Sequence, residues 1–456
     1  MIDLSTIRHI HFIGVGGIMM SGIAEMLHQR SYIVTGSDQM KSERCSHLEE
    51  NGLKIYYGHQ ADHVQGADLI VYSSAVSESN LEYLEGIRLE IPLLSRAEMI
   101  GQLMPEYETS IAIAGAHGKT STTSMVSNIL NASTYNPTVL VGGITKNTGS
   151  NVQIGDHSVL LLEACEYKEN FLSFNHNLGV ILNIDEDHLD YFDNLEHIIS
   201  AFIKFAKKIP KDGVLVINND DYNARKVISH VSCNVITFGI STDSTFQAKN
   251  ITFDNQGHST FDVYHKNIFY GAFTLNVPGQ HNIYNALAAI VSAYVVKIPV
   301  EVIKEAVKSY NGTERRFEIL GEYNGATIID DYAHHPTEIK ATLSAAKKIP
   351  HEKTICIFQP HTYTRTNELL LQFATAFKEA DHVIITDIYA AREVNTPNIH
   401  AKDLVRAIAE EHSKVKYIET FDEIISYLQS TIQPNDLILT LGAGNIRLVG
   451  ESIVKK

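Results

Sequence analysis

The sequence predicts an α/β protein of three domains: a Rossmann-like N-terminal domain, a central domain of the P-loop ATPase type, and a Rossmann-like C-terminal domain. Short apolar runs alternate with amphipathic stretches in three successive series, which is typical of mostly parallel sheets covered by helices. Polar turn-forming residues interrupt this pattern near Tyr107 and near Gly312. We therefore expect domains at residues 1–107, 108–312 and 313–456 of the 456-residue chain.

The apolar runs place the strands that we expect. In the first domain they are His9–Ile13, Tyr32–Thr35, Lys54–Tyr57 and Asp68–Tyr72. In the central domain they begin with Ile111–Ala114, Ser158–Leu162 and Val180–Asn183. In the third domain they are Ala326–Ile329, Thr354–Phe358, His382–Thr386 and Asp436–Leu441.

The segment Asp212–Leu275 differs from the rest of the central domain. It has strand-like runs at Val214–Ile217, Val235–Phe238 and Ile268–Thr274, with few helical stretches between them. This pattern predicts an antiparallel insertion or a smaller side sheet beside the mostly parallel central sheet.

Composition and charge exclude several classes of protein. The net charge of −16 opposes non-specific binding to nucleic acid or to an anionic membrane. No apolar stretch approaches the ~20 residues that span a bilayer, and the N-terminus has no secretory signal pattern. The 4 cysteines are too dispersed for a CxxC motif or a disulfide scaffold. These observations predict a cytoplasmic protein.

The strongest local motif is a phosphate-binding loop. The strand Ile111–Ala114 runs into Gly115-Ala-His-Gly118-Lys119-Thr120, and a helix-compatible stretch follows. Glycines let backbone N–H groups converge on phosphate oxygens, and a helix N-terminus adds positive partial charge. We expect Lys119 to bridge the β- and γ-phosphates of ATP and the Thr120 hydroxyl to hold Mg²⁺. The loop is two residues shorter than the usual Walker spacing.

A second glycine-rich loop lies near the N-terminus, at Gly14–Gly22. Together with Asp38, at the end of the second strand and 22 residues after Gly16, it resembles a dinucleotide-binding fingerprint. Met19 occupies the slot where the third glycine is expected. Alone, the loop would suggest a dehydrogenase.

Charged groups follow other strands. Glu163 ends a buried strand, where an unpaired carboxylate would be costly, so we expect it to face the Lys119–Thr120 loop as a magnesium ligand. Asp331 and His334 follow a strand of the third domain, and Arg365, after the next strand, suits a carboxylate.

Cys165 lies between Glu163 and Glu166, and we interpret it as a spectator because neighbouring carboxylates disfavour a thiolate. Cys356 lies inside an apolar strand and is expected in the core.

These motifs together resemble those of the Mur ligase family, which builds the peptide of bacterial cell-wall precursors. The resemblance starts at G-x-H-G-K-T and covers nearly the whole chain in the family's order. The other matching segments are Gly14–Gly22, Glu163–Glu166, Asn183–Asp190, Gly279–Ala286, Arg315–Glu318, Asp330–Glu338 and Gln359–Arg365. Several of these forms are typical of the branch that adds alanine.

The resemblance implies an activity and its substrates. The expected reaction joins L-alanine to the lactyl carboxylate of UDP-N-acetylmuramate, through an acyl phosphate formed with ATP. The implied cofactors are ATP and Mg²⁺, with Mn²⁺ also suitable because an imidazole is an unusual magnesium ligand. Domain closure around the substrates is expected, and the oligomeric state is not indicated.

The resemblance also implies residue roles. Lys119, Glu163, His188, His334 and Arg365 are expected to be catalytic, with Arg365 and His334 meeting the amino acid. The implied metal ligands are Thr120, Glu163 and His188, the last two sharing a second ion. ATP is expected to contact Gly115, His117, Gly118, Lys119, Thr120, Ser121, His281, Asn282, Asn285, Arg316 and Asp331. The UDP-sugar is expected to contact Gly14, Gly16, Gly17, Ser21, Asp38 and Ser73.

Some roles stay open. Asn282 suits either an adenine contact or a helix N-cap. Arg315 and Arg316, if on a strand, face opposite sides, so one would reach the γ-phosphate and the other would pair structurally.

Three alternative functions also stay open. One is a ligase that attaches a preformed cell-wall tripeptide to the same nucleotide sugar. Another is an NAD(P)-dependent oxidoreductase, which would leave Gly118-Lys119-Thr120 unexplained. The third is a non-catalytic binding protein, which the presence of Lys119, Glu163 and His188 disfavours.

Overall fold

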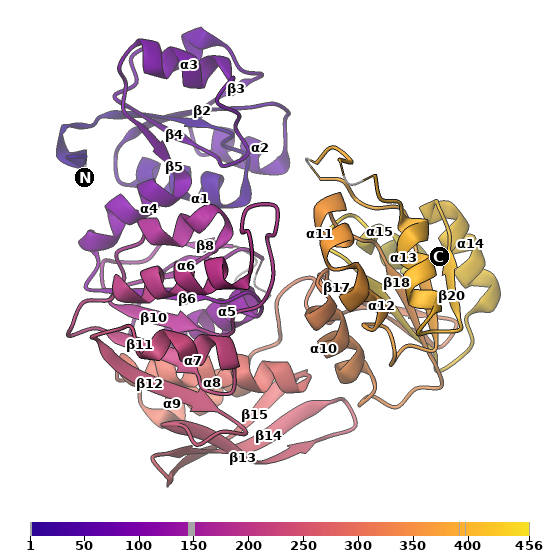
Figure 1. Ribbon diagram of the computed structural model, residues 1–456. Helices are drawn as coiled ribbons and strands as arrows, with labels where there is room; N and C mark the ends of the chain where they lie inside the picture. The colour runs from indigo at the N-terminus through magenta and orange to yellow at the C-terminus, as the bar shows by residue number, and fades with distance from the viewer. Residues whose placement is uncertain (1, 145–150, 392, 397, 456) are drawn as a thin grey trace.

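Three β-sheets follow one another along the chain (Figure 1). The structure is a computed structural model and describes residues 2–144, 151–391, 393–396 and 398–455. The predicted α/β class with three successive sheets is confirmed. Among the described residues, no helix is both long enough and apolar enough to cross a membrane.

The first sheet is entirely parallel, with the strand order β3-β2-β1-β4-β5. Its strands are β1 His9–Ile13, β2 Ile33–Asp38, β3 Lys54–Tyr57, β4 Leu69–Tyr72 and β5 Leu93–Ser95. The helices are α1 Ile18–Gln29, α2 Glu43–Glu50, α3 Leu81–Arg88 and α4 Arg96–Leu103. This is the Rossmann order 3-2-1-4-5-6 without its sixth strand, with the switch point between β1 and β4.

The central sheet has 10 strands in the order β15-β14-β13-β12-β11-β10-β6-β9-β7-β8. The strands are β6 Thr109–Ala114, β7 Thr138–Leu140, β8 Val152–Gln153, β9 Val159–Glu163, β10 Leu178–Ile181, β11 Val214–Asn218, β12 Asn234–Gly239, β13 Phe246–Phe253, β14 His258–His265 and β15 Ile268–Pro278. The helices are α5 Lys119–Asn131, α6 Leu195–Lys207, α7 Tyr222–Ile228, α8 Gln280–Val295 and α9 Val300–Lys308.

The prediction for Asp212–Leu275 needs a correction. Strands β11 and β12 run parallel to β10 and belong to the main sheet. Only β13, β14 and β15 are antiparallel, and β13 pairs with β12, so they extend the central sheet at its edge. Between β11 and β12 lies α7, which has only 7 residues. A helix this short leaves a weak periodic pattern, which is why the sequence resembled an antiparallel segment.

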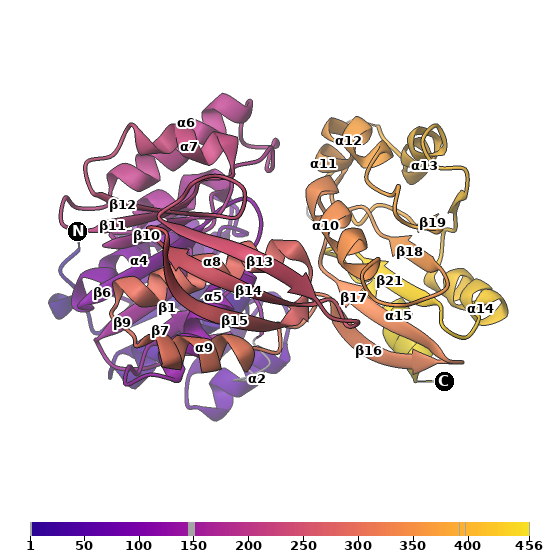
Figure 2. The ribbon, with the colours of Figure 1, turned by 90° about the horizontal axis from the view of Figure 1, so that it is seen from below.

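The third sheet has the order β16-β17-β21-β18-β19-β20, with only β16 antiparallel. The strands are β16 Glu318–Tyr323, β17 Ala326–Asp331, β18 Thr354–Phe358, β19 His382–Ile385, β20 Val415–Tyr417 and β21 Leu437–Leu441. The helices are α10 Pro336–Ala346, α11 Tyr363–Glu368, α12 Leu370–Ala374, α13 Ala401–Ala409, α14 Phe421–Thr431 and α15 Arg447–Val454. In both overall views α10 and α11 lie on the side that faces the central sheet (Figures 1 and 2).

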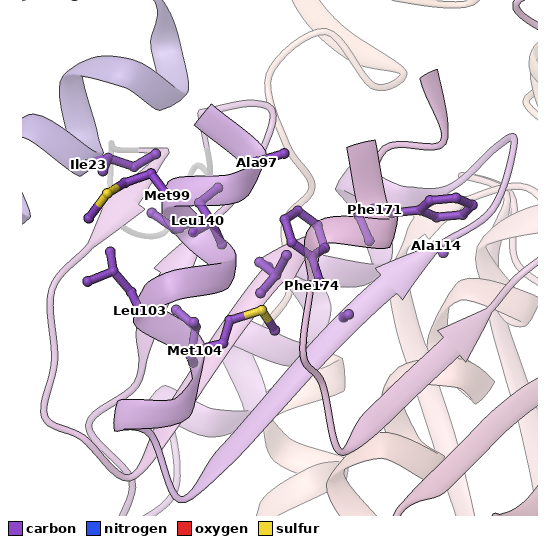
Figure 3. Packing of buried hydrophobic residues seen from close by; sticks show 14 of the residues in the cluster. Ile23, Ala97, Met99, Leu103, Met104, Ala114, Leu140, Phe171 and Phe174 are labelled. Atoms are coloured by element: carbon purple, nitrogen blue, oxygen red, sulfur yellow. The ribbon is translucent and has the colours of Figure 1, made fainter. Parts of the chain in front are cut away.

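The first two sheets share one apolar core, whereas the third sheet has cores of its own. In Figure 3, α4 packs between Ile23 of α1 and Leu140, Phe171 and Phe174 of the central domain. Burial of this continuous apolar surface fixes the N-terminal domain on the central domain. The C-terminal domain is therefore the part that is best placed to move as a unit.

Gly101 makes the contact between α4 and the central domain possible. A Cβ at Gly101 would lie 2.1 Å from the carbonyl oxygen of Ser173, a backbone atom that cannot turn away. We expect Gly101→Ala to lower the free energy of unfolding by ~1–3 kcal/mol, because overpacking forces the backbone apart. Thermal unfolding followed by circular dichroism measures the change. A matched control is Gly86→Ala in α3, whose Cβ would come close only to the terminal methyl of Ile70, a side-chain end that can turn away; equal effects of both variants would contradict this reading.

Candidate active site

The phosphate loop joins β6 to α5 with a sharp backbone turn. Gly118 is the residue before the helix and has φ 84°, a left-handed conformation that favours glycine. A Cβ at Gly118 would also lie 2.4 Å from the side-chain oxygen of Asn285. The N-terminus of α5 therefore opens directly onto α8, with no side chain between them.

Lys119, the first residue of α5, is held by carboxylate and carbonyl oxygens. Its Nζ donates to both carboxylate oxygens of Glu166, at 2.9 and 3.1 Å, and to the carbonyl oxygen of Gly115 at 2.5 Å. Burial opposes the charged form, but the Glu166 charge outweighs it and raises the pKa of Lys119. The lysine is therefore a fixed positive charge at the end of the loop.

Thr120 and Glu163 meet beside this lysine. The Thr120 hydroxyl donates to Glu163 Oε2 at 3.0 Å, and the backbone N–H of Gly142 donates to the same oxygen at 2.9 Å. Glu163 is the last residue of β9, as its position after an apolar run predicted. A hydroxyl and a carboxylate oxygen this close are donors of the kind that Mg²⁺ prefers. The residues present thus fit the ion that the motifs predict.

His188 lies next to a different carboxylate from the one expected. Its Nε2 is 3.8 Å from Glu166 Oε1 and 3.9 Å from Asp187 Oδ2. These three side chains form a group that could hold a metal ion. The shared ion of Glu163 and His188 stays a prediction, and Glu166 is the carboxylate that this structure places beside the imidazole.

A cavity of about 430 Å³ lies between the central and C-terminal domains. Eight of the residues expected to contact ATP line it: His117, Gly118, Ser121, His281, Asn282, Asn285, Arg316 and Asp331. Gly115, Lys119 and Thr120 belong to the adjoining loop and the first turn of α5. The expected ATP residues are thus gathered at one place from both domains.

The two asparagines of α8 are linked in a chain of hydrogen bonds. Thr122 Oγ1 donates to Asn285 Oδ1 at 3.2 Å, and Asn285 Nδ2 donates to Asn282 Oδ1 at 3.0 Å. Asn282 Nδ2 in turn donates to the carbonyl of Pro278 at 2.8 Å. The N-cap of α8 is Gly279, with φ 97°, so the interpretation of Asn282 as the N-cap is wrong. Burial, followed by Arg316, lowers the pKa of the neighbouring His281 to about 4.

Arg315 and Arg316 lie in a turn before β16, so the assumption that they sit on a strand is wrong. Arg315 has φ 59° and donates to the carbonyl oxygen of Gly442 at 2.6 Å and to Asp330 at 3.3 Å. Arg316 lines the cavity. One arginine, Arg315, therefore pairs structurally and the other, Arg316, faces the cavity, but they do so from a turn and not from a strand.

The Glu338 carboxylate of α10 contacts residues of both the central and the C-terminal domain. Its carboxylate accepts from the backbone N–H of His334 at 3.1 Å and lies 3.4 Å from His117 Nδ1 on the phosphate loop. Burial raises the pKa of Glu338, but the nearby His334 and His117 outweigh burial and hold it well below the usual range. His117 is also 3.1 Å from Asp185, and these two carboxylates overcome burial to raise its pKa to about 10.

Asp331 and His334 sit at the end of β17, as expected. Asp331 accepts from the backbone N–H groups of Phe317 and Ala333 at 2.8 and 2.7 Å. Burial is the main cause of its pKa of about 6. Burial likewise lowers the pKa of His334 to about 4, so its ring is neutral near pH 7.

The segment 185–188 of the central domain carries several further polar contacts to the C-terminal domain. Asp187 Oδ1 accepts from Arg365 Nη2 at 2.7 Å and from Nε at 3.1 Å. Glu186 accepts from His335 through its carbonyl oxygen at 2.8 Å, and Asp185 accepts from Thr337 Oγ1 at 2.7 Å. A second cavity, of about 400 Å³, is lined by Asp187, His188 and Arg365. Arg365 was expected to hold the carboxylate of the amino acid, and in this structure its guanidinium pairs with the Asp187 side chain, so the substrate role stays a prediction.

The N-terminal glycine loop turns tightly against β2. Gly14 has φ 78°, and Gly17 is the N-cap of α1, so Met19 lies in the first helical turn. The Gly16 N–H donates to Asp38 Oδ2 at 2.8 Å, and a Cβ at Gly16 would lie 2.8 Å from that oxygen. Ser73 packs beside Gly14, and the Ser21 hydroxyl donates to the carbonyl oxygen of Ile18, three residues earlier in α1.

Both cysteine interpretations agree with the structure. Burial, with the Glu166 charge, raises the pKa of the Cys165 thiol to about 11. Cys356 is buried in the C-terminal core.

Three residues of the site were not assigned a role from sequence: Glu166, Asp187 and Glu338. All three stand within the motifs that were singled out, and each is a carboxylate near a motif histidine. That signal marks them as candidates, but it does not show which cation each one meets.

Models of three domain families match successive parts of the chain. "Mur ligase family, catalytic domain" matches residues 9–108, "Mur ligase middle domain" residues 113–293, and "Mur ligase, glutamate ligase domain" residues 315–444. The chain belongs to the Mur ligase family. The predicted resemblance is therefore confirmed.

Individual relatives extend this finding over the full length. The UDP-N-acetylmuramate–L-alanine ligase of Alkaliphilus metalliredigens is 49% identical over 452 residues, covering 99% of this chain and 98% of the relative. The enzyme of the same name from Caldanaerobacter subterraneus is 48% identical over 455 residues, covering 100% and 99%. Among solved structures, the UDP-N-acetylmuramate-alanine ligase of Thermotoga maritima has a TM-score of 0.81 at 28% identity, covering 98% of both chains. A murein peptide ligase of Psychrobacter arcticus has the same fold, with a TM-score of 0.73 at 23% identity.

Proposed function

We propose that this Mur ligase joins L-alanine to the lactyl carboxylate of UDP-N-acetylmuramate, with ATP converted to ADP and phosphate. The reaction belongs to the synthesis of peptidoglycan precursors. The observation that carries the proposal is the fixed Lys119 charge and the Thr120–Glu163 pair, which adjoin a cavity lined by Gly118, Ser121 and residues of the C-terminal domain. Relatives at 45–49% identity over nearly the full length bear the name of this activity.

The chemistry requires two anions to approach each other. A lactyl carboxylate oxygen attacks the γ-phosphorus of ATP, so an acyl phosphate forms and ADP leaves. The amine of L-alanine then attacks the acyl carbon, loses a proton, and phosphate leaves. Lys119 and the backbone N–H groups at the start of α5 supply fixed positive charge where negative charge accumulates. Closure of the C-terminal domain brings Arg316 and His334 to the reacting groups.

We assign the remaining residues by their places in the site. Mg²⁺, with Mn²⁺ as an alternative, would be held by Thr120 and Glu163, with His188 at a second ion, and would neutralise phosphate charge. The adenine side of the cavity belongs to His281, Asn282 and Asn285, and Asp331 suits the ribose. The UDP diphosphate belongs to the loop of Gly14, Gly16, Gly17 and Ser21, with Asp38 and Ser73 beside it. We also propose that the domain boundaries lie near residues 107 and 312.

One incubation tests the proposed function. The protein is mixed with UDP-N-acetylmuramate, ATP and MgCl₂, and offered L-alanine, glycine, L-serine and the cell-wall tripeptide together. Mass spectrometry identifies the product, and we expect the alanine adduct to dominate. A tripeptide adduct alone would keep the chemistry and overturn the amino-acid assignment. Tight NAD(P) binding without UDP-sugar binding, measured by calorimetry, would overturn the ligase proposal.

The proposed metal role of Glu163 gives a separate expected result. Glu163→Gln keeps the shape but removes the charge that a hard cation favours, so the apparent Mg²⁺ affinity should fall by about tenfold or more. Initial rates over a range of MgCl₂ concentrations measure the change. Glu169→Gln is the matched control, because Glu169 pairs with Lys204 at 2.8 Å. An unchanged Mg²⁺ dependence in folded Glu163→Gln would assign Glu163 a structural role only.

A further inference from the structure

Glu82 of α3 is a buried carboxylate that the proposed chemistry does not use. Its side chain is fully buried, and it lies in the N-terminal domain behind the end of β2. A carboxylate without partners would be too costly to bury there. Its partners therefore indicate what it does.

Four side chains surround the Glu82 carboxylate. Ser37 Oγ donates to Oε2 at 2.5 Å, and His59 Nδ1 lies 3.2 Å from the same oxygen. His63 Nδ1 lies 2.6 Å from Oε1, and His11 Nε2 lies 3.7 Å from Oε2. Burial raises the pKa of Glu82, but these groups, His11 and Ser37 foremost, outweigh burial and lower it to about 2. The carboxylate is therefore ionised at any pH used for assay.

The partner that matters is Ser37, because its backbone holds the glycine loop. The carbonyl oxygen of Ser37 accepts from the N–H groups of Gly14 and Val15 at 2.8 and 2.9 Å. The next residue, Asp38, accepts from the Gly16 N–H at 2.8 Å. The N–H groups of three successive loop residues, Gly14, Val15 and Gly16, thus donate to the last two residues of β2.

The same network holds Asp38 from its other side. The Asp38 carbonyl oxygen accepts from the Gly58 N–H at 2.8 Å. His59 follows immediately and lies against Glu82, and the Gln60 N–H donates to Glu82 Oε1 at 3.4 Å. Glu82 therefore ties together the end of β2 and the segment 58–60, the two elements that fix Ser37 and Asp38.

We infer that Glu82 is a positioning residue for the nucleotide-sugar loop, acting through Ser37 and the segment 58–60. The inference rests on the proposed function, which assigns this loop to the UDP diphosphate. The N–H groups of Gly14, Val15 and Gly16 are occupied by Ser37 and Asp38, so the network fixes the path of the loop and the start of α1 behind it. A small misplacement of that path would weaken every contact to the ligand at once. Glu82 supplies that order without touching the ligand.

Two variants test the inference. Glu82→Gln removes the charge and keeps the volume, and Ser37→Ala removes the hydroxyl link while leaving the Ser37 carbonyl in place. We expect each to raise the Kd for UDP-N-acetylmuramate, by about tenfold for Glu82→Gln, the size expected when a hydrogen bond to a charged group is lost. The KM values for ATP and L-alanine should stay at the wild-type level. The double variant should bind no worse than Glu82→Gln alone, because the two residues act in one chain.

Calorimetric titration of the full-length protein with UDP-N-acetylmuramate, together with thermal unfolding, separates the outcomes. Glu85→Gln is the matched control, since Glu85 lies one turn away on α3 and pairs with Arg88. An unchanged Kd in folded Glu82→Gln overturns the inference, as does a uniform loss of kcat with all KM values unchanged. If Glu82→Gln does not fold, an unchanged Kd in Ser37→Ala overturns it. Failure of the wild-type protein to bind the UDP-sugar would instead overturn the proposed function.

Discussion

Replacing Lys119 by alanine is expected to lower the rate of ligation by at least ~10²–10³-fold, the usual cost of removing one donor that stabilises charge in the transition state. The Nζ group already sits among oxygens at the start of α5, with Glu166 as its counter-ion. When ATP binds, the β- and γ-phosphates replace Glu166 or share Lys119 with it. Coupled measurement of ADP release, with saturating alanine and UDP-sugar, gives the rate.

The loss of Lys119 also leaves Glu166 without its cation. The Glu166 side chain is only 3% exposed, so an unpaired charge there should lower stability as well as activity. The double variant Lys119→Ala/Glu166→Gln separates the two effects, because it removes both charges. We expect it to recover most of the thermal stability and none of the ligation. Turnover within tenfold of wild type in a folded Lys119→Ala protein would defeat the assignment.

Buried apolar strands of the fold follow from sequence, whereas very short strands and the more polar strands β13 and β14, of 8 residues each, do not. The runs at His9–Ile13, Lys54–Tyr57 and Thr354–Phe358 match β1, β3 and β18 residue for residue. Strands such as β5 and β8, of 3 and 2 residues, were not predicted. Segments this short carry no periodicity, and only pairing with a neighbouring strand makes them strands.

The site shows a similar division. The ends of β6, β9 and β17 could be predicted as places for ligands, because polar residues follow apolar runs there. The partners could not, since Lys119 meets Glu166 across 47 positions and Arg365 meets Asp187 across 178. The first pair depends on how neighbouring strands and helices pack, and the second on how the domains pack; neither is contained in local spacing.

Replacing Arg365 by alanine should raise the KM for L-alanine far more than the KM for ATP. The guanidinium presents a planar set of donors that suits a carboxylate, and its side chain is 10% exposed at the edge of a cavity. Neutral His334 can accept a hydrogen bond near the amine without repelling it. We expect the KM for alanine to rise by about tenfold or more, the cost of losing a charge-assisted pair. Steady-state kinetics with each substrate varied in turn measure the change.

The Asp187 contact allows this role to be separated from domain closure. Asp187→Asn keeps the guanidinium of Arg365 and weakens its bond to the central domain, whereas Arg365→Ala removes the guanidinium as well as that bond. If Arg365 binds the amino acid, Asp187→Asn should leave the KM for alanine near or below the wild-type value, because the guanidinium is freed. Equal losses of kcat in both variants, with all KM values unchanged, would make the pair a closure contact and nothing more. A rise in the KM for the UDP-sugar alone would assign Arg365 to the muramic acid carboxylate. The methyl group of L-alanine is a weaker determinant of binding than its carboxylate and is worth ~1–3 kcal/mol. Glycine should therefore be accepted roughly 10–200-fold less well than alanine.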